Sequence, residues 1–225
     1  MVLRRRRLFL NLLSLCLVLS LPSFYADAGF GNFAFSRRKS TSPAFAYRSV
    51  AEGALPPGVQ TGDLMVAAAI DTSSMSAPAG WTRIGTEQTP GSTYVSFFYR
   101  FRQAGDTFPT FSSAWNTYVI VGAFINVSSS APLYAVSTTE VSTANPTLPS
   151  LTASGTAGDA AIYMAIGESG IPYAPPTDYT EAFDNGYDET LGYRLNLSAS
   201  QSTSGTLTVA ASNKGLLHLI LKKAP

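Results

Sequence analysis

The chain has 225 residues, of which 45% are hydrophobic and only 13% are charged, and its formal net charge is +1. Without residues 1–28, which carry four arginines and one aspartate, the net charge becomes about −2. This balance argues against a nucleic-acid binder, whose affinity depends on neutralising many phosphates. Frequent Thr, Ser, Gly, Tyr and Phe residues, with no sustained helical period beyond the N-terminus, favour an all-β fold.

Residues 1–28 have the three-part pattern of a secretory signal. Arg4 to Arg7 form a basic segment, residues 8–21 are largely apolar, and Ala26 and Ala28 are the small residues that a signal peptidase reads. We expect cleavage before Gly29, with an uncleaved anchor or a buried N-terminal arm as the alternatives. The only cysteine, Cys16, lies in this leader, so the remaining chain has no disulfide, thiol nucleophile or cysteine metal site.

Residues 29–44 form a predicted flexible arm that combines aromatic and basic side chains. If the arm stays solvated, its charges need no partner. If it docks on another protein, the rings would bury area and the cations would set orientation. The candidate assembly residues are Phe30, Phe33, Phe35, Arg37, Arg38 and Lys39.

The rest of the chain repeats itself at a distance of roughly a hundred residues. Residues 62–70 are echoed by 158–166, residues 77–82 by 174–180, and 99–101 by 193–195, and each half ends on an apolar strand. This repetition predicts an antiparallel β-sandwich, jelly-roll-like, built from two four-strand halves over about 59–127 and 155–222. Residues 45–225 are expected to form one domain.

The expected strands follow from apolar runs bounded by Gly, Pro, Asn and Ser. A first strand is expected at 45–50, and edge strands are expected around 134–141 and 148–153 in the crossover between the halves. The strands of the two repeats are predicted near 63–71, 81–88, 93–103 and 117–127, and near 159–168, 179–183, 189–198, 206–211 and 215–223.

His218 is the only histidine, and it lies in an apolar run near the end of the chain. A packed strand residue fits this position better than a catalytic base, which would need an open cleft and a reachable serine. There is no second histidine for a zinc site and no Gly-rich phosphate loop. We therefore predict no enzymatic activity, no catalytic residue, no metal ligand and no cofactor.

The acidic segment 178–189 leaves two interpretations open. Asp184, Asn185 and Asp188 could offer oxygen ligands to Ca²⁺. Residues 184–186 also read Asp-Asn-Gly, a sequence that favours a hairpin turn. Because the equivalent place in the first half, residues 88–92, reads as a plain hairpin tip, the hairpin is the preferred interpretation.

Two further aspartates occupy matching strand starts. Because Asp63 and Asp159 recur in both halves, a turn or an arginine-pairing role is expected for each. The expected partners are Arg100 for Asp63 and Arg194 for Asp159.

Aromatic side chains supply the remaining candidates for binding. Trp81 and Tyr179 occupy matching positions and are expected to plug the ends of the sandwich. Exposed rings beside polar groups hold sugars or protein partners at low entropic cost. Trp115, Tyr187 and Tyr173 are the candidate ligand-binding residues.

Four short motifs carry a family resemblance. Residues 62–68, 77–82, 98–100 and 110–112 resemble β-sandwich modules of phage tail, fibre and capsid-decoration proteins and of related bacterial surface proteins. The resemblance covers about 59–222. It implies a non-catalytic, homo-oligomeric virion component that attaches to protein partners by its arm and presents a binding surface.

Two other functions follow from the leader and the acidic segment. An exported bacterial surface or secreted protein that binds carbohydrate, such as a host-surface glycan, is the main alternative; it would contact a membrane only through an uncleaved leader. A secreted hydrolase, with its carboxylates in residues 178–189, is the third.

Overall fold

The computed structural model describes residues 45–111, 118–167, 173–186 and 188–225. The chain divides into two units, Met1–Arg38 and Lys39–Pro225, and all of the described residues belong to the second. The predicted leader and arm therefore lie outside the described residues. Within those residues there is no helix, and thus none long and apolar enough to cross a membrane.

Twelve strands account for the described secondary structure. They follow the predicted order closely: β1 (Ala46–Glu52), β2 (Leu64–Asp71), β3 (Thr82–Gln88), β4 (Tyr94–Phe101), β5 (Tyr118–Ile125), β6 (Leu133–Val141), β7 (Thr147–Thr152), β8 (Asp159–Gly167), β9 (Thr180–Asp184), β10 (Glu189–Leu197), β11 (Ser202–Thr206) and β12 (Lys214–Leu221).

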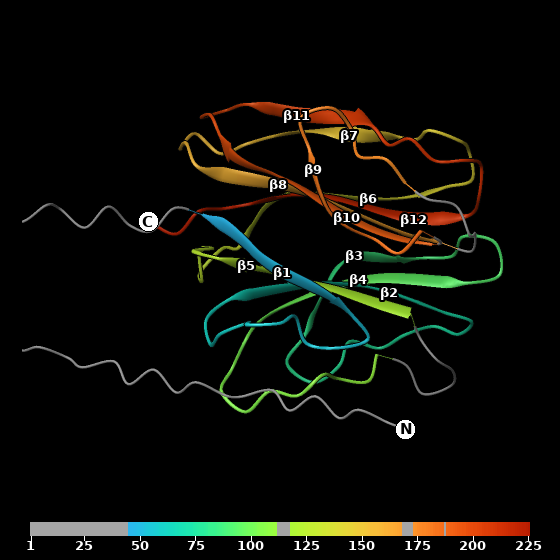
Figure 1. The fold of residues 1–225 in the computed structure, drawn as a ribbon, viewed down its shortest axis with the longest axis horizontal. Helices are drawn as coiled ribbons and strands as arrows, with labels where there is room; N and C mark the ends of the chain where they lie inside the picture. The colour runs from blue at the N-terminus through green and yellow to red at the C-terminus, as the bar shows by residue number, and fades with distance from the viewer. Residues whose placement is uncertain (1–44, 112–117, 168–172, 187) are drawn as a thin grey trace, which may run out of the picture. The chain divides into compact units, whose positions relative to one another are not determined.

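The strands form two antiparallel five-stranded sheets, each made from one continuous part of the chain (Figure 1). The first sheet has the order β1-β5-β2-β4-β3 and the second has the order β6-β12-β8-β10-β9. A two-stranded ribbon of β7 and β11 lies beyond the second sheet. The all-β, sandwich-like fold class is confirmed.

The two sheets also correspond strand by strand. Across the interface β2 faces β8, β4 faces β12, β5 faces β10, β3 faces β6 and β1 faces β9. These contacts are the ones that an approximate two-fold axis between the two sheets would produce. Such an axis is the symmetry of a self-complementary interface. This topology is the one that an internal repeat requires. That the halves superpose residue by residue stays a prediction.

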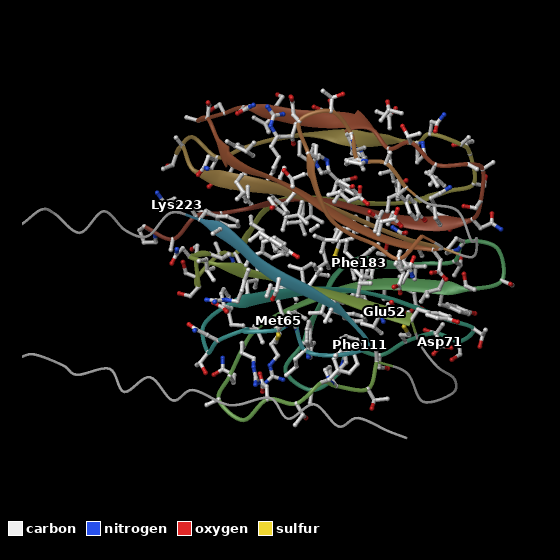
Figure 2. All side chains as sticks on the ribbon, viewed as in Figure 1. Glu52, Met65, Asp71, Phe111, Phe183 and Lys223 are labelled. Carbon is white, nitrogen blue, oxygen red and sulfur yellow. The ribbon has the colours of Figure 1, made fainter. Side chains whose placement is uncertain are left out.

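The central strands of each sheet are buried on both faces, which explains the continuous apolar runs of the sequence. Every residue of β2, β8 and β12 is buried. The central cluster lies between the sheets and includes Leu64, Phe97, Phe124, Ile162 and Leu219. In Figure 2, Phe183 points into this layer, whereas Met65 and Phe111 lie on the far side of the first sheet.

One expected strand is misplaced. A strand was predicted at 206–211, but β11 spans Ser202–Thr206. The alternation of Leu207 and Val209 suggested a ladder, and both side chains are indeed buried. Their backbone bonds run elsewhere, because Leu207 N–H donates to the Pro146 carbonyl and Thr208 forms an isolated bridge with Ala174. Side-chain periodicity alone therefore did not fix the pairing.

Candidate functional site

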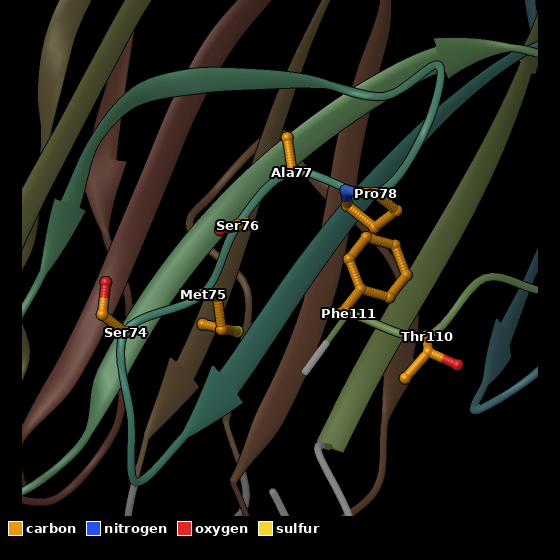
Figure 3. A pocket seen from close by; sticks show the side chains of 7 residues that line it. All are labelled: Ser74, Met75, Ser76, Ala77, Pro78, Thr110 and Phe111. Carbon is orange, nitrogen blue, oxygen red and sulfur yellow. The ribbon is translucent and has the colours of Figure 1, made fainter. Parts of the chain in front are cut away.

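A shallow pocket opens on the outer face of the first sheet. Its volume is about 430 Å³, and Figure 3 shows the ring of Phe111 facing Pro78 across it. The pocket combines one aromatic ring with three hydroxyl groups, and it is lined by Ser74, Met75, Ser76, Ala77, Pro78, Thr110 and Phe111. An aromatic surface beside hydroxyls is chemistry that suits a sugar or a small polar ligand.

Phe111, which lines this pocket, belongs to a cluster of aromatic rings. Phe111 packs edge-on against Trp81 at 5.2 Å between centroids and lies 5.3 Å from Phe98 of β4. Trp81 is only 6% exposed and contacts the pocket through the ring of Phe111. Its ring covers the outer face of the first sheet. The expectation that Trp81 plugs an end of the sandwich is therefore wrong.

Glu87 of β3 fixes the segment that forms one wall. It accepts hydrogen bonds from the Ser74 hydroxyl at 2.6 Å and from the Met75 N–H at 2.9 Å. Burial opposes ionisation of Glu87, but these bonds, one from Ser96 and the charge of Arg83 outweigh burial and lower its pKa. The wall is therefore held by an ionised carboxylate.

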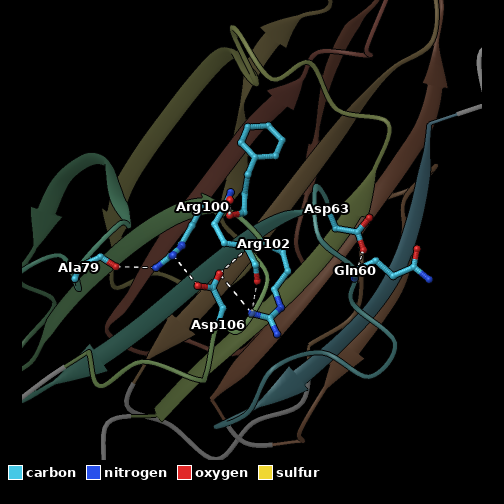
Figure 4. A network of polar contacts seen from close by, with 8 residues as sticks. Gln60, Asp63, Ala79, Arg100, Arg102 and Asp106 are labelled. Carbon is cyan, nitrogen blue, oxygen red and sulfur yellow. Dashed lines mark hydrogen bonds and ion pairs between the residues drawn. The ribbon is translucent and has the colours of Figure 1, made fainter.

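An ion-pair network lies next to the pocket on the same face (Figure 4). The Arg100 guanidinium contacts Asp106 at 2.7 Å and donates to the Ala79 carbonyl at 2.8 Å. Arg102 lies 3.4 Å from the same carboxylate. The predicted pair of Arg100 with Asp63 is wrong, because Asp106, in the loop after β4, lies closer along the chain and reaches both arginines.

The two repeated aspartates have structural partners of a different kind. Asp63 forms an ion pair with Arg48, which the β-bulge between Tyr47 and Ser49 turns toward it, and accepts the Gln60 N–H at 2.7 Å. Asp159 accepts the N–H groups of Ser154 at 2.9 Å and Lys223 at 3.1 Å.

The second predicted ion pair, Asp159 with Arg194, is also wrong. Arg194 instead lies 3.4 Å from the exposed Asp178. The carboxylate of Asp159 already accepts hydrogen bonds from two backbone N–H groups, which stabilise its charge in place of an arginine. The turn role that was expected for both aspartates fits these contacts.

His218 is buried on the outer face of the second sheet, with both ring nitrogens engaged. Nδ1 lies 2.7 Å from the Pro149 carbonyl, and Nε2 lies 2.7 Å from the Tyr179 hydroxyl. A carbonyl only accepts, so Nδ1 carries the proton and Nε2 accepts from Tyr179. Burial lowers the pKa of His218, despite its bond to Pro149, and favours this neutral form. The histidine thus links β12 to β7 and to the segment before β9.

The acidic segment forms the β9–β10 hairpin that was preferred from its sequence. Gly186 has φ +76°, and its N–H donates to Asp184 at 2.7 Å. Asp184 also accepts the Tyr173 N–H at 3.0 Å. Among the described residues, no group of three His, Cys, Asp or Glu side chains is placed to hold a metal ion.

Glu189 is the unusual carboxyl of this hairpin. It is fully buried, and its Oε1 has no hydrogen-bond partner within the described part of the chain. Burial, with the nearby charges of Glu52 and Asp188, raises its pKa to about 8. Its other oxygen, Oε2, accepts only a 3.3 Å bond from the Asn185 amide among the described residues, so the neutral, protonated acid is the favoured form at neutral pH.

The candidate binding residues from the sequence are only partly described. Trp115, Tyr187 and the six arm residues lie outside the described ranges. Tyr173 is described, but it is 5% exposed, and its hydroxyl donates to the Asp188 carbonyl at 3.3 Å. Its ring packs under the second sheet's cover and lines a shallow pocket of about 430 Å³ with Asn145, Ala174 and Thr208, so its role in ligand binding stays a prediction.

Three exposed hydrophobic side chains were not singled out from the sequence. Tyr118 and Tyr134 are each 52% exposed and Val136 is 38% exposed. Tyr134 and Val136 are neighbours on β6, an outer strand of its sheet. Their alternation was visible in the sequence, but their exposure depends on the strand order.

The architecture and these contacts define an all-β protein of two stacked antiparallel sheets, in which most described polar groups serve the fold. Comparison with protein-family models, with curated proteins and with solved structures finds no match to this chain.

Proposed function

We propose that this chain is a non-catalytic structural and binding module of a phage particle, as a tail, fibre or decoration component. In this proposal the arm of residues 29–44 attaches the protein to an oligomeric assembly, and the sandwich presents a binding surface outward. The resemblance over about 59–222 supports the particle, and the aromatic and basic composition of the arm supports attachment.

The hydrogen bonds of the reactive side chains are the observation that supports the non-catalytic part of this proposal. Both nitrogens of His218 are held by protein groups in a fully buried position. The carboxylates of Asp159 and Asp184 accept backbone N–H groups. A general base needs a free lone pair near a substrate proton. Both ring nitrogens of His218 are engaged, and the two carboxylates bind backbone N–H groups, which supports a role in the fold.

Deleting residues 29–44 from the chain tests the proposal directly. We expect the variant to fold, because the central cluster begins at Phe45 and lies within the described residues. It should fail to enter particles in a complementation assay with a deletion phage. Replacing Phe30, Phe33 and Phe35 with Ala should reproduce most of this loss, and replacing the exposed Tyr118 with Ala is the matched control. Normal incorporation of a folded arm-less variant would refute attachment by the arm.

The pocket on the first sheet favours one second candidate, an exported carbohydrate-binding protein. Its ring and hydroxyls suit a sugar, and the leader suits export. N-terminal sequencing separates the two. Gly29 as the first residue of protein from culture medium supports export, whereas Met1 in purified particles supports the virion role. Hydrolysis of a polysaccharide by the purified protein would contradict both.

A further inference from the structure

The outer strands of the two sheets differ in how they are protected against pairing with another chain. An outer strand presents unpaired N–H and C=O groups, and proteins blunt such edges with short strands, bulges or charges. In this protein β1 and β3 are the outer strands of the first sheet, and β6 and β9 are those of the second.

Three of these four edges carry a protective feature. β1 has a bulge between Tyr47 and Ser49, which interrupts its edge. β3 loses its regular pairing between Ile84 and Gln88, where Gly85 has φ +66°. β9 has only five residues, and two of them, Glu181 and Asp184, are acidic.

β6 is less protected than these three edges from Ala135 to Val141. It has nine residues, and its pairing with β12 is regular from Val141 to Ala135, with an irregularity only at its first residues. It contains no proline and one charged residue, Glu140. No other strand of the described residues pairs with its second side. In Figure 1, β6 runs beside β12 at the border of its sheet.

The exposed apolar side chains gather on this same strand. Val136 lies in the regular part of β6, and Tyr134 lies at the irregularity between Leu133 and Ala135 near its start. A paired strand would cover them and would satisfy the open backbone groups. We propose that β6 is a homodimer interface, in which β6 of a second copy pairs antiparallel with it and joins the two second sheets into one.

The sequence of β6 is self-complementary when the two-fold axis passes through Ser137. Val136 then lies opposite Thr138 of the second copy, and Tyr134 lies opposite Glu140. The Val136–Thr138 pairs are β-branched, and such pairs pack well between antiparallel strands. The two Glu140 carboxylates would lie about 20 Å apart at about 3.4 Å per residue, beyond the range of strong repulsion at physiological salt. A second copy is therefore a better occupant than a chain of unrelated sequence. This interface gives a structural basis for the oligomer in the proposed function.

The oligomeric state of the full chain provides the first test. Light scattering should show a dimer, and Val136→Lys should raise its dissociation constant by roughly 100-fold, because the two lysines would lie diagonally across the axis. Tyr118→Lys, an equally drastic change at an exposed residue of the central strand β5, should leave the dimer intact. A monomeric wild type at roughly 100 μM, or a dimer that Val136→Lys does not weaken, would overturn the proposal.

A cysteine pair tests the register. In a Cys16→Ser background, Ser137→Cys should give a disulfide-linked dimer, because the two residues would face each other across the axis at about 5 Å. Thr139→Cys is the control, since its mate would lie about 14 Å away. Equal cross-linking of both, or of Thr139→Cys alone, refutes the register and the proposal with it. A monomer that still enters particles through its arm would leave the proposed function standing, so the two failures can be told apart.

Discussion

On the outer face of the first sheet, irregular loops cover the strands, whereas on the equivalent face of the second sheet the β7–β11 ribbon does so. Trp81 and Tyr179 hold corresponding places under these covers. The first cover is fastened by ion pairs at Asp106, and the second by the neutral bonds of His218. The comparison indicates that both covers bury a large aromatic ring, whereas the polar contacts that fasten the two covers differ.

The largest expected effect comes from removing the aromatic anchor of the first cover. Trp81→Ala should lower the free energy of unfolding by about 3–5 kcal/mol, because its ring packs against Phe111 and is 6% exposed. Urea denaturation measures the change, with Tyr118→Ala as an exposed aromatic control. A loss below about 1 kcal/mol would mean that the loops are not a packed cover and would break the comparison.

The stability of the layer between the sheets should depend on pH through Glu189. This pH dependence distinguishes the layer from either cover. Its pKa is about 8 in the fold and near 4.5 when unfolded, so the folded state binds the extra proton. Stability is thus full below pH 4.5 and falls as pH rises toward 8, by on the order of a few kcal/mol. Unfolding curves across this range should show the decline in the wild type and a flatter profile in Glu189→Gln. Parallel profiles would contradict the burial of this acid.

A smaller effect is expected at the neutral bonds of the second cover. Tyr179→Phe removes the short bond to His218 Nε2 and leaves this buried acceptor only the Thr203 hydroxyl at 3.5 Å, so it should cost about 1–3 kcal/mol. Because no ion pair is involved, the loss should change little between low and high salt. Tyr134→Phe, at a 52% exposed tyrosine, is the control and should be almost neutral.

The smallest effect should come from the ion pairs of the first cover. Asp106→Asn leaves the shape of the loop but removes the charge between Arg100 and Arg102, and partly exposed pairs of this kind contribute about 0–1 kcal/mol. The difference from wild type should shrink as salt is raised. If salt acted on Tyr179→Phe and not on Asp106→Asn, the two covers would have been assigned the wrong chemistry.

Much of the fold could be predicted because burial leaves a direct trace in sequence. The wholly buried strands β2, β8 and β12 appear as unbroken apolar runs, and the Asp-Asn-Gly turn at 184–186 marks the β9–β10 hairpin. The partners of polar groups could not be predicted in the same way. Asp63 bonds to Arg48 through a bulge in β1, and no local pattern announces a bulge there.

Exposure was equally hard to predict, because it depends on strand order. Tyr134 and Val136 are exposed since β6 is an outer strand, whereas Tyr173 is buried beneath the second cover. Tyr134 and Tyr173 are the same residue type, so residue type alone did not separate the exposed tyrosine from the buried one.

The main chain passes between the two sheets once, in the short segment after Ile125 and before Leu133. Every backbone ladder of the first sheet is complete before this segment, and every ladder of the second forms after it. The contact between the sheets is thus chemically a dimer interface with a covalent tether. Two fragments cut within this tether would each keep all of the strands of one sheet, which suits the protein to fragment complementation, in which function returns when two separately made pieces reassociate.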